Sequence, residues 1–236
     1  MKIMDLGHFH HCFVNYHVAS EELVSYIPKT YELDLFENRP VVSWVASTLQ
    51  DVKVFGVPWA IDEMVFSLTL RTYVKKRRAD EWIRGILPLS SWMSGKKVPA
   101  AFRWIANHKP NDLKLDRSIH FEPFEKSSRG VFEYRWPKTN SDGSNLLRLR
   151  TVGVPQPALA GYLEFFTTER YIQLDLDSQK SKGLRFQREP WYLWEIDELV
   201  LPETWPGEIL PSLKTQKPVF SFVVKGSKTR IDRIKL

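Results

Sequence analysis

The chain has 236 residues, of which 43% are hydrophobic and 13% aromatic, and its formal net charge is +6. This composition is that of a globular protein and contains too many aromatic residues for a disordered chain. The single cysteine, Cys12, excludes an intramolecular disulfide and a cysteine-based zinc site. The first residues lack the apolar core of a signal peptide, and no stretch approaches the ~20 apolar residues that span a bilayer, so we expect a soluble, cytoplasmic protein.

Strand-like runs dominate the chain, because β-branched and aromatic residues recur between Gly, Pro and Asn. Cys12 falls in the first such run, which favours a small buried side chain over a catalytic nucleophile. The polar run 137–144 has a turn-forming residue at nearly every position and predicts a hairpin loop. In chain order we predict strands over residues 9–17, 40–54, 64–74, 83–89, 118–124, 130–136, 146–152, 170–176, 184–188, 192–196 and 219–224.

Helix signals are few. Residues 20–27 begin with a capping serine and two acids and stop before Pro28. Residues 99–107 have Pro99 in the first turn and apolar residues at helical spacing, and a third short helix is predicted around 157–162. Because no repeat or linker is present, we expect residues 1–236 to form a single domain. Its class is α+β and mostly β: an antiparallel β-barrel or curved sheet with two or three short helices.

The first candidate site residues are Arg71 and Tyr73, which lie within an otherwise apolar strand. A period of two places both on one face and the aliphatic residues on the other. A charge in such a strand must be paired or face a cavity, because an unpaired buried charge is very costly. Arg71 could bind a carboxylate or phosphate in a cavity, with Tyr73 as a hydrogen-bond donor. Alternatively, Arg71 could pair with an internal acid such as Glu169 and seal one end of a barrel.

Glu169 and Tyr171 form a second candidate pair. They follow Thr167 and Thr168 at the start of a predicted strand, where Glu169 and Tyr171 share a face and Arg170 takes the other. If the Glu169 face is inward, a carboxylate and a phenol lie together inside the fold. Such a pair could support general acid–base chemistry or simply anchor the strand.

A tandem of lysines, Lys96-Lys97, follows a Ser-Gly pair and precedes the second predicted helix. In Schiff-base enzymes one lysine can lower the pKa of its neighbour, so this spacing suggests such chemistry. A Ser-Gly-Lys-Lys string is also an ordinary exposed turn, and lysines are usually exposed.

Two basic runs, 75–78 and 225–235, contain much of the positive charge. They could contact nucleic-acid phosphates, but such runs more often form solvated turns and tails. We therefore expect nucleic-acid binding only as a lesser alternative.

Histidines gather near the beginning of the chain. His8 and His10 share a strand face and, with a third ligand such as His120, could bind a metal. Such pairs are more often surface or edge residues. We expect neither a metal nor a cofactor.

A third charged string is Arg188-Glu189-Pro190-Trp191, and nine tryptophans are distributed over the chain. Aromatic residues at this density either fill a wide barrel or line an apolar pocket. The sequence leaves both possibilities open, and Trp191 is a candidate lining residue.

Seven strings occur in the order and spacing of a known family, although none of them is specific alone. They resemble the YqjF-like group of uncharacterised conserved proteins, whose fold is related to acetoacetate decarboxylase. The resemblance covers nearly the whole chain and implies an acetoacetate-decarboxylase-like β-barrel with an internal cavity. The strings are residues 10–28, Leu33-Asp34-Leu35-Phe36, 41–44, Arg71-Thr72-Tyr73-Val74, 165–171, Glu189-Pro190-Trp191 and Lys217-Pro218-Val219-Phe220.

The resemblance does not imply the decarboxylase reaction. Those enzymes use a Schiff-base lysine in a Pro-Lys-Lys string after a helix, and the matching stretch here is Pro110-Asn111-Asp112. Relatives tend to carry a glutamate and an asparagine where this chain has Ser67 and Thr69, and a histidine where it has Arg188. Without the lysine there is no covalent electron sink, and without the glutamate there is no carboxylate to tune it.

The sequence therefore predicts binding of a small anionic or carbonyl-containing molecule in a barrel cavity through Arg71, Tyr73, Glu169, Tyr171 and Trp191. One alternative is a decarboxylase- or lyase-type enzyme with a repositioned lysine, so enzyme activity stays open. Another is a basic nucleic-acid-binding protein. Edge strands of a partly open barrel often pair across subunits, so a homodimer is a further prediction.

Overall fold

The computed structural model describes residues 1–236 except 61–62, 107–108, 122–128, 139–141, 176–181 and 208. The helices are α1 (Ser20–Leu23), α2 (Lys97–Ala106) and α3 (Leu163–Thr168), with 3-10 segments η1 (Val24–Tyr26) and η3 (Pro211–Lys214). The strands are β1 (Lys2–His17), β2 (Glu32–Leu33), β3 (Val41–Val54), β4 (Val57–Ala60), β5 (Val65–Arg78), β6 (Glu81–Met93), β7 (Asn111–Asp112), β8 (Asp116–Phe121), β9 (Gly130–Pro137), β10 (Ser144–Pro157), β11 (Ile172–Leu174), β12 (Lys182–Gln187), β13 (Tyr192–Val200), β14 (Phe220–Lys225) and β15 (Lys228–Lys235).

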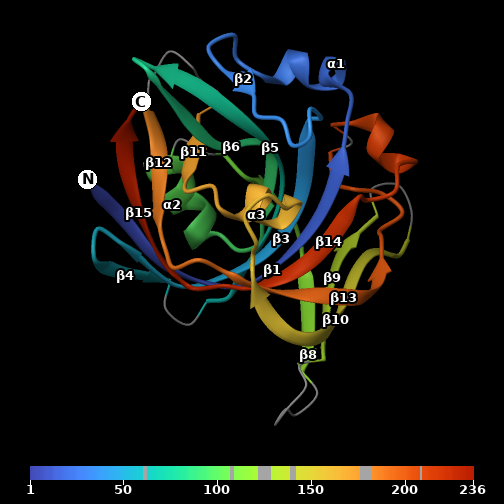
Figure 1. The fold of residues 1–236 in the computed structure, drawn as a ribbon. Coiled ribbons are helices and arrows are strands. Elements are labelled where there is room, and N and C mark those ends of the chain that lie inside the picture. The colour runs from blue at the N-terminus through green and yellow to red at the C-terminus, as the bar shows by residue number, and fades with distance from the viewer. Residues whose placement is uncertain (61–62, 107–108, 122–128, 139–141, 176–181, 208) are drawn as a thin grey trace.

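Seven of these strands close into a barrel. The path β3-β5-β6-β11-β12-β15-β1 ends where it began, because β1 also pairs with β3 along most of its length. The pairings are antiparallel except those of β6 with β11 and β7. Figure 1 shows the strands curving around α2 and α3. This architecture confirms the predicted mostly-β class and curved antiparallel barrel.

The long strand β1 connects the barrel to a second group of strands. Its beginning pairs with β15 and its later part with β14, and from β14 the sheet continues through β13, β10 and β9 to β8. These strands form a wing beside the barrel, at the lower right of Figure 1. The predicted β9–β10 hairpin is confirmed by the pairing of the two strands, although residues 139–141 of its loop lie outside the described ones.

Strand β15 corrects the interpretation of residues 225–235 as a solvated basic tail. It pairs with β1 and β12 and thereby closes the barrel. The buried residues Thr229 and Ile231 alternate with exposed Lys228 and Arg230, as a half-buried strand requires. The charged residues of this run, such as Lys228 and Arg230, made the period of two hard to recognise in the sequence.

The helix predictions are confirmed in two cases and displaced in the third. The predicted helix 20–27 is α1 continued by η1, and the predicted helix 99–107 is α2, with Asn107 outside the described residues. The third helix begins at Leu163 instead of lying over 157–162, because Gly161 adopts a left-handed conformation with φ of 92° just before it. Glu169 is therefore the residue after a helix and not the start of a strand.

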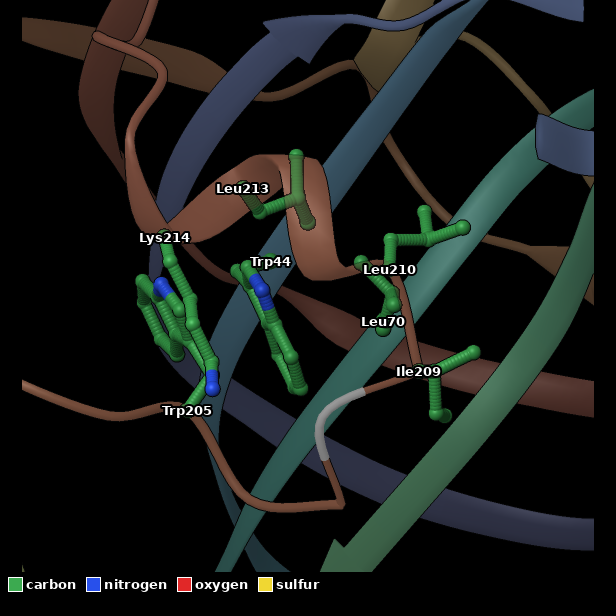
Figure 2. A pocket seen from close by; sticks show the side chains of 7 residues that line it. All are labelled: Trp44, Leu70, Trp205, Ile209, Leu210, Leu213 and Lys214. Atoms are coloured by element: carbon green, nitrogen blue, oxygen red, sulfur yellow. The ribbon is translucent and has the colours of Figure 1, made fainter.

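The two faces of β3 and β5 serve different purposes. Leu68 and Leu70 pack with Trp44 in the large core cluster between barrel and wing, whereas Ser67, Thr69 and Arg71 face a cavity, which confirms the predicted alternation. Figure 2 shows Trp44 beside Trp205 and below Leu213. The gap that these residues line has a volume of only about 10 Å³. The rings of Trp44 and Trp205 stack at 4.6 Å between centroids. These aromatic residues therefore fill the core.

Cys12 is fully buried in the same core cluster, as predicted. In the part of the chain that the structure describes, no helix has the length and apolar character needed to cross a membrane.

Candidate functional site

The barrel encloses a cavity of about 120 Å³. Each of the seven barrel strands contributes at least one lining residue, and α2 and α3 contribute Phe102 and Thr168. The wall is apolar in part, from residues such as Phe186 and Trp191. The remainder is polar: it presents the hydroxyls of Ser47, Ser67, Thr69 and Ser91, and the guanidinium groups of Arg71, Arg170 and Arg188. This mixture of apolar surface and a few convergent polar groups is typical of a small-molecule site.

Arg71 is fixed by neutral partners. Its Nη2 donates to the carbonyl oxygen of Thr167 at 2.8 Å, and its Nε donates to the hydroxyl of Tyr73 at 3.3 Å. Its guanidinium lies 5.0 Å from the ring centroid of Phe13. Among the described residues no carboxylate lies within salt-bridge distance of it, so the alternative in which Arg71 pairs with Glu169 is wrong. The N–H groups not used in these two bonds remain for another acceptor.

A buried chain of hydrogen bonds holds the Tyr73 hydroxyl in place. Asn15 donates its amide N–H to the carbonyl of Phe220 at 3.0 Å, so its oxygen accepts the Ser43 hydroxyl at 2.6 Å. Since Ser43 has one proton, the 2.7 Å contact between Tyr73 and Ser43 must use the Tyr73 proton. Tyr73 then accepts from Arg71. Tyr73 is fully buried and lies outside the lining residues, and it orients Arg71 from behind.

The end of α3 explains why two arginines converge. The last carbonyl groups of a helix have no partner within it and form its negative end. The carbonyl of Thr167 accepts from Arg71 and that of Thr168 accepts from Arg188. The short helix α3 therefore draws both guanidinium groups to the cavity wall.

Arg188 is embedded among aromatic rings. Its guanidinium lies 3.6 Å from the ring centroid of Trp191 and 4.7 Å from that of Tyr171, and its Nη2 lies 3.8 Å from Glu169 Oε1. Burial lowers the pKa of Arg188 to about 10, although the charge of Glu169 opposes this shift. Tyr171 donates its hydroxyl to the other oxygen of Glu169. Glu169 and Tyr171 thus contact each other, but on the outer side of Arg188 and not on the cavity wall.

Arg170 lines the cavity next to Arg188 and has its own acid. Its Nη2 donates to Asp34 Oδ2 at 2.9 Å, and Arg84 lies 3.2 Å from the other oxygen of Asp34. Burial lowers the pKa of Arg170, with Asp34 acting in the opposite direction. Among the described residues, the carboxylates that pair with any of the three cavity arginines are Asp34 and Glu169. Asp34 also pairs with Arg84. The cavity is electropositive as a result.

The structure brings the predicted site residues into one cluster but gives them different places. Arg71 and Trp191 line the cavity, whereas Tyr73, Glu169 and Tyr171 stand behind the lining. The sequence interpretation did not select Arg170 and Arg188 for the site. The strand pattern predicts Arg170 on the face opposite Glu169 and Tyr171, and it leaves open which of the two faces is inward. Arg188 could have been selected as a site residue because relatives tend to have a histidine at its position.

Lys96 and Lys97 are both exposed at the start of α2, and neither lies among the described lining residues of the cavity.

The ends of the strands that contain the two basic runs meet at a groove. In this groove Arg78 and Lys235 lie near the acidic residues Asp80 and Glu81. In the described ranges no group of three His, Cys, Asp or Glu side chains could hold a metal ion. The side chains of His8 and His120 are outside the described residues.

Tyr171 gives the site a measurable pH dependence. Burial and the hydrogen bond to Glu169 raise the pKa of Tyr171 from 10.0 to about 12. Unfolding therefore releases the phenol proton between these values, so the stabilisation is complete below pH 10 and is lost as the pH rises toward 12. We expect the free energy of unfolding of Tyr171→Phe to fall less steeply over this range than that of the wild type, in urea denaturation at a series of pH values. Equal slopes would contradict this assignment.

Solved structures of low sequence identity share this fold. An acetoacetate decarboxylase-like enzyme from Sphingomonas wittichii superposes with a TM-score of 0.61 and 12% identity, over 100% of this chain and 93% of that chain. Acetoacetate decarboxylase from Legionella pneumophila gives 0.60 and 12%, over 99% and 86%. The enduracididine biosynthesis enzyme MppR complexed with pyruvate gives 0.60 and 6%, over 99% and 90%. The chain therefore has an acetoacetate-decarboxylase-like fold.

Most of the chain also matches a protein family. The model of DUF2071, described as an uncharacterised conserved protein, matches residues 8–222, and the chain belongs to this family. The resemblance found in the sequence is thereby confirmed. A comparison with curated proteins gives no match.

Proposed function

We propose that the protein binds a small carboxylate, including carbonyl-containing anions, in the barrel cavity. The observation that carries this proposal is Arg71, whose guanidinium lines the cavity with no carboxylate partner among the described residues. An uncompensated cation in a partly buried site is costly, and a ligand carboxylate would remove that cost. The planar fork of arginine matches a carboxylate, which makes Arg71 suited to this role.

The predicted site residues take distinct roles in this proposal. Arg71 binds the carboxylate, and Tyr73 orients Arg71. Trp191 contributes apolar surface to the cavity wall, while Glu169 and Tyr171 hold Arg188 beside it. The pyruvate complex of MppR, a protein with the same fold, makes pyruvate a reasonable first probe.

The alternatives receive less support. A Schiff-base enzyme needs a lysine at the ligand, and Lys96 and Lys97 are exposed outside the described lining. A nucleic-acid interface needs a continuous basic surface, whereas acids interrupt the groove in which the basic runs meet. The homodimer stays a prediction, with β4 and β8 as the ends of the sheet path in the described residues.

The test compares pyruvate with its neutral amide, pyruvamide, by isothermal titration calorimetry on the purified protein. The two molecules are similar in shape, and only pyruvate has the negative charge. We expect pyruvate to bind at least ~10-fold more tightly, because one charge-assisted hydrogen-bonded pair is worth roughly 1.5–3 kcal/mol. Equal affinities, or no binding of either molecule, would overturn the proposal.

A further inference from the structure

A bulge in β1 turns His11 toward the cavity. Phe9 pairs with Thr48 and His11 pairs with Ser47, so His10 is the extra residue of β1. Its φ of 52° is uncommon for a residue with a side chain. Bulges re-aim side chains and are over-represented next to active sites. Here the bulge directs the His10 ring to the aromatic core and leaves His11 on the cavity wall.

His11 and Ser47 contact each other inside the cavity. His11 Nδ1 lies 2.7 Å from Ser47 Oγ, and both residues line the cavity. His11 is 3% exposed and Ser47 is 7% exposed, so bulk water has little access to the contact. A hydroxyl within hydrogen-bond reach of an imidazole is the arrangement by which a serine nucleophile is activated.

The imidazole of His11 is also held in a fixed orientation. It stacks on Trp191 with 4.3 Å between ring centroids and an interplanar angle of 23°. Trp191 donates its indole N–H to Ser227 Oγ at 3.1 Å, and Arg188 packs on the same indole. An activated nucleophile requires such a third group, because the base must be oriented toward the hydroxyl.

We propose that Ser47 and His11 are a nucleophile–base pair that acts on a small ester or thioester with a free carboxylate; the carboxylate part rests on the proposed function. Ser47 Oγ bonds to the acyl carbon while His11 Nδ1 takes the hydroxyl proton. The bond from the acyl carbon to the leaving alkoxide or thiolate breaks, and His11 returns the proton to that group. Water, deprotonated by His11, then attacks the acyl carbon, and Ser47 leaves with its proton restored.

The positions of Arg71 and Ser67 restrict the substrate. The Arg71 guanidinium packs on Phe13, which is two residues from His11 on the same strand face, or roughly 7 Å along the strand. The carboxylate and the acyl carbon are thus separated by a short carbon chain, as in a monoester or monothioester of a small dicarboxylic acid. Ser67 lies directly opposite Ser47 in the pairing of β5 with β3 and would donate a hydrogen bond to the oxyanion.

The experiment uses methanesulfonyl fluoride, a small reagent that sulfonylates activated serines with loss of fluoride. We measure the rate of adduct formation on the full chain by intact-protein mass spectrometry and locate the adduct by peptide mapping. We expect one adduct at Ser47, none in Ser47→Ala, and a rate lowered by ~100-fold or more in His11→Asn, since a general base contributes roughly 10²–10⁴-fold. Circular dichroism identifies any variant that does not fold.

The matched control is Ser221→Ala. Ser221 is also 7% exposed and lies on β14, which is paired with β1 on the side away from β3, but it does not line the cavity. We expect this variant to react at the wild-type rate. Absence of an adduct at Ser47 in the wild type, or an unchanged rate in folded His11→Asn, would overturn the nucleophile–base pair. Calorimetry with pyruvate tests the proposed function separately, because sulfonylation needs no carboxylate.

Discussion

Replacement of Arg71 by glutamine is expected to weaken pyruvate binding by roughly 30-fold or more, or ~2 kcal/mol and above. Glutamine keeps a polar side chain but has neither the charge nor the fork that would hold a carboxylate. Removal of one member of a partly buried, hydrogen-bonded charge pair also leaves the ligand charge without a partner. Calorimetric titration of the variant with pyruvate measures the loss.

Two controls separate this binding effect from an effect on folding. Arg135→Gln removes an arginine of β9 that is paired with Glu133 and lies away from the cavity, so its pyruvate affinity should stay within about twofold of the wild type. Urea denaturation reports how much stability Arg71→Gln loses when the Thr167 carbonyl loses its donor. A folded Arg71→Gln protein with wild-type affinity would show that Arg71 only caps α3.

Trp44→Ala is expected to destabilise the protein by about 3–5 kcal/mol, the range for deleting a large buried aromatic side chain. Trp44 is 1% exposed, stacks on Trp205 and lies 5.6 Å from Trp92, measured between ring centroids. The gap beside the ring (Figure 2) has a volume of only about 10 Å³, so alanine would leave a new cavity between barrel and wing. The free energy of unfolding in urea measures the effect.

The control for this prediction is Trp104→Ala, because Trp104 is 69% exposed on α2. This substitution should change the free energy of unfolding by only ~0.5 kcal/mol. Since Trp44 points away from the cavity face of β3, folded Trp44→Ala protein should also keep the wild-type affinity for pyruvate. A loss below ~1 kcal/mol in Trp44→Ala would mean that the barrel–wing core is not closely packed.

The local pattern of the chain was sufficient for most of its strands, although not for β2, β4, β7 and β15, and for one wall of the site. The alternation around Arg71 depends only on the period of a strand, so Ser67, Thr69 and Arg71 could be assigned to one face before any partner was known. The helix starting at Lys97 and the β9–β10 hairpin likewise depend on signals within a few residues. The family resemblance added the barrel and its cavity, which no single segment encodes.

Contacts between distant segments decided the remainder. The pairing of β1 with β3 places the bulge at His10 and brings His11 to Ser47, which is 36 residues away in the chain. The end of α3 gathers Arg71 and Arg188 through its carbonyl groups, and Asp34 holds Arg170 across 136 residues. Sequence periodicity describes which face a residue occupies within one element, whereas these contacts depend on how elements meet. For this reason the sequence by itself determined most of the barrel strands and the candidate arginine. Only the tertiary structure showed that residues 228–235 close the barrel as β15, and which charges and hydroxyls share the cavity.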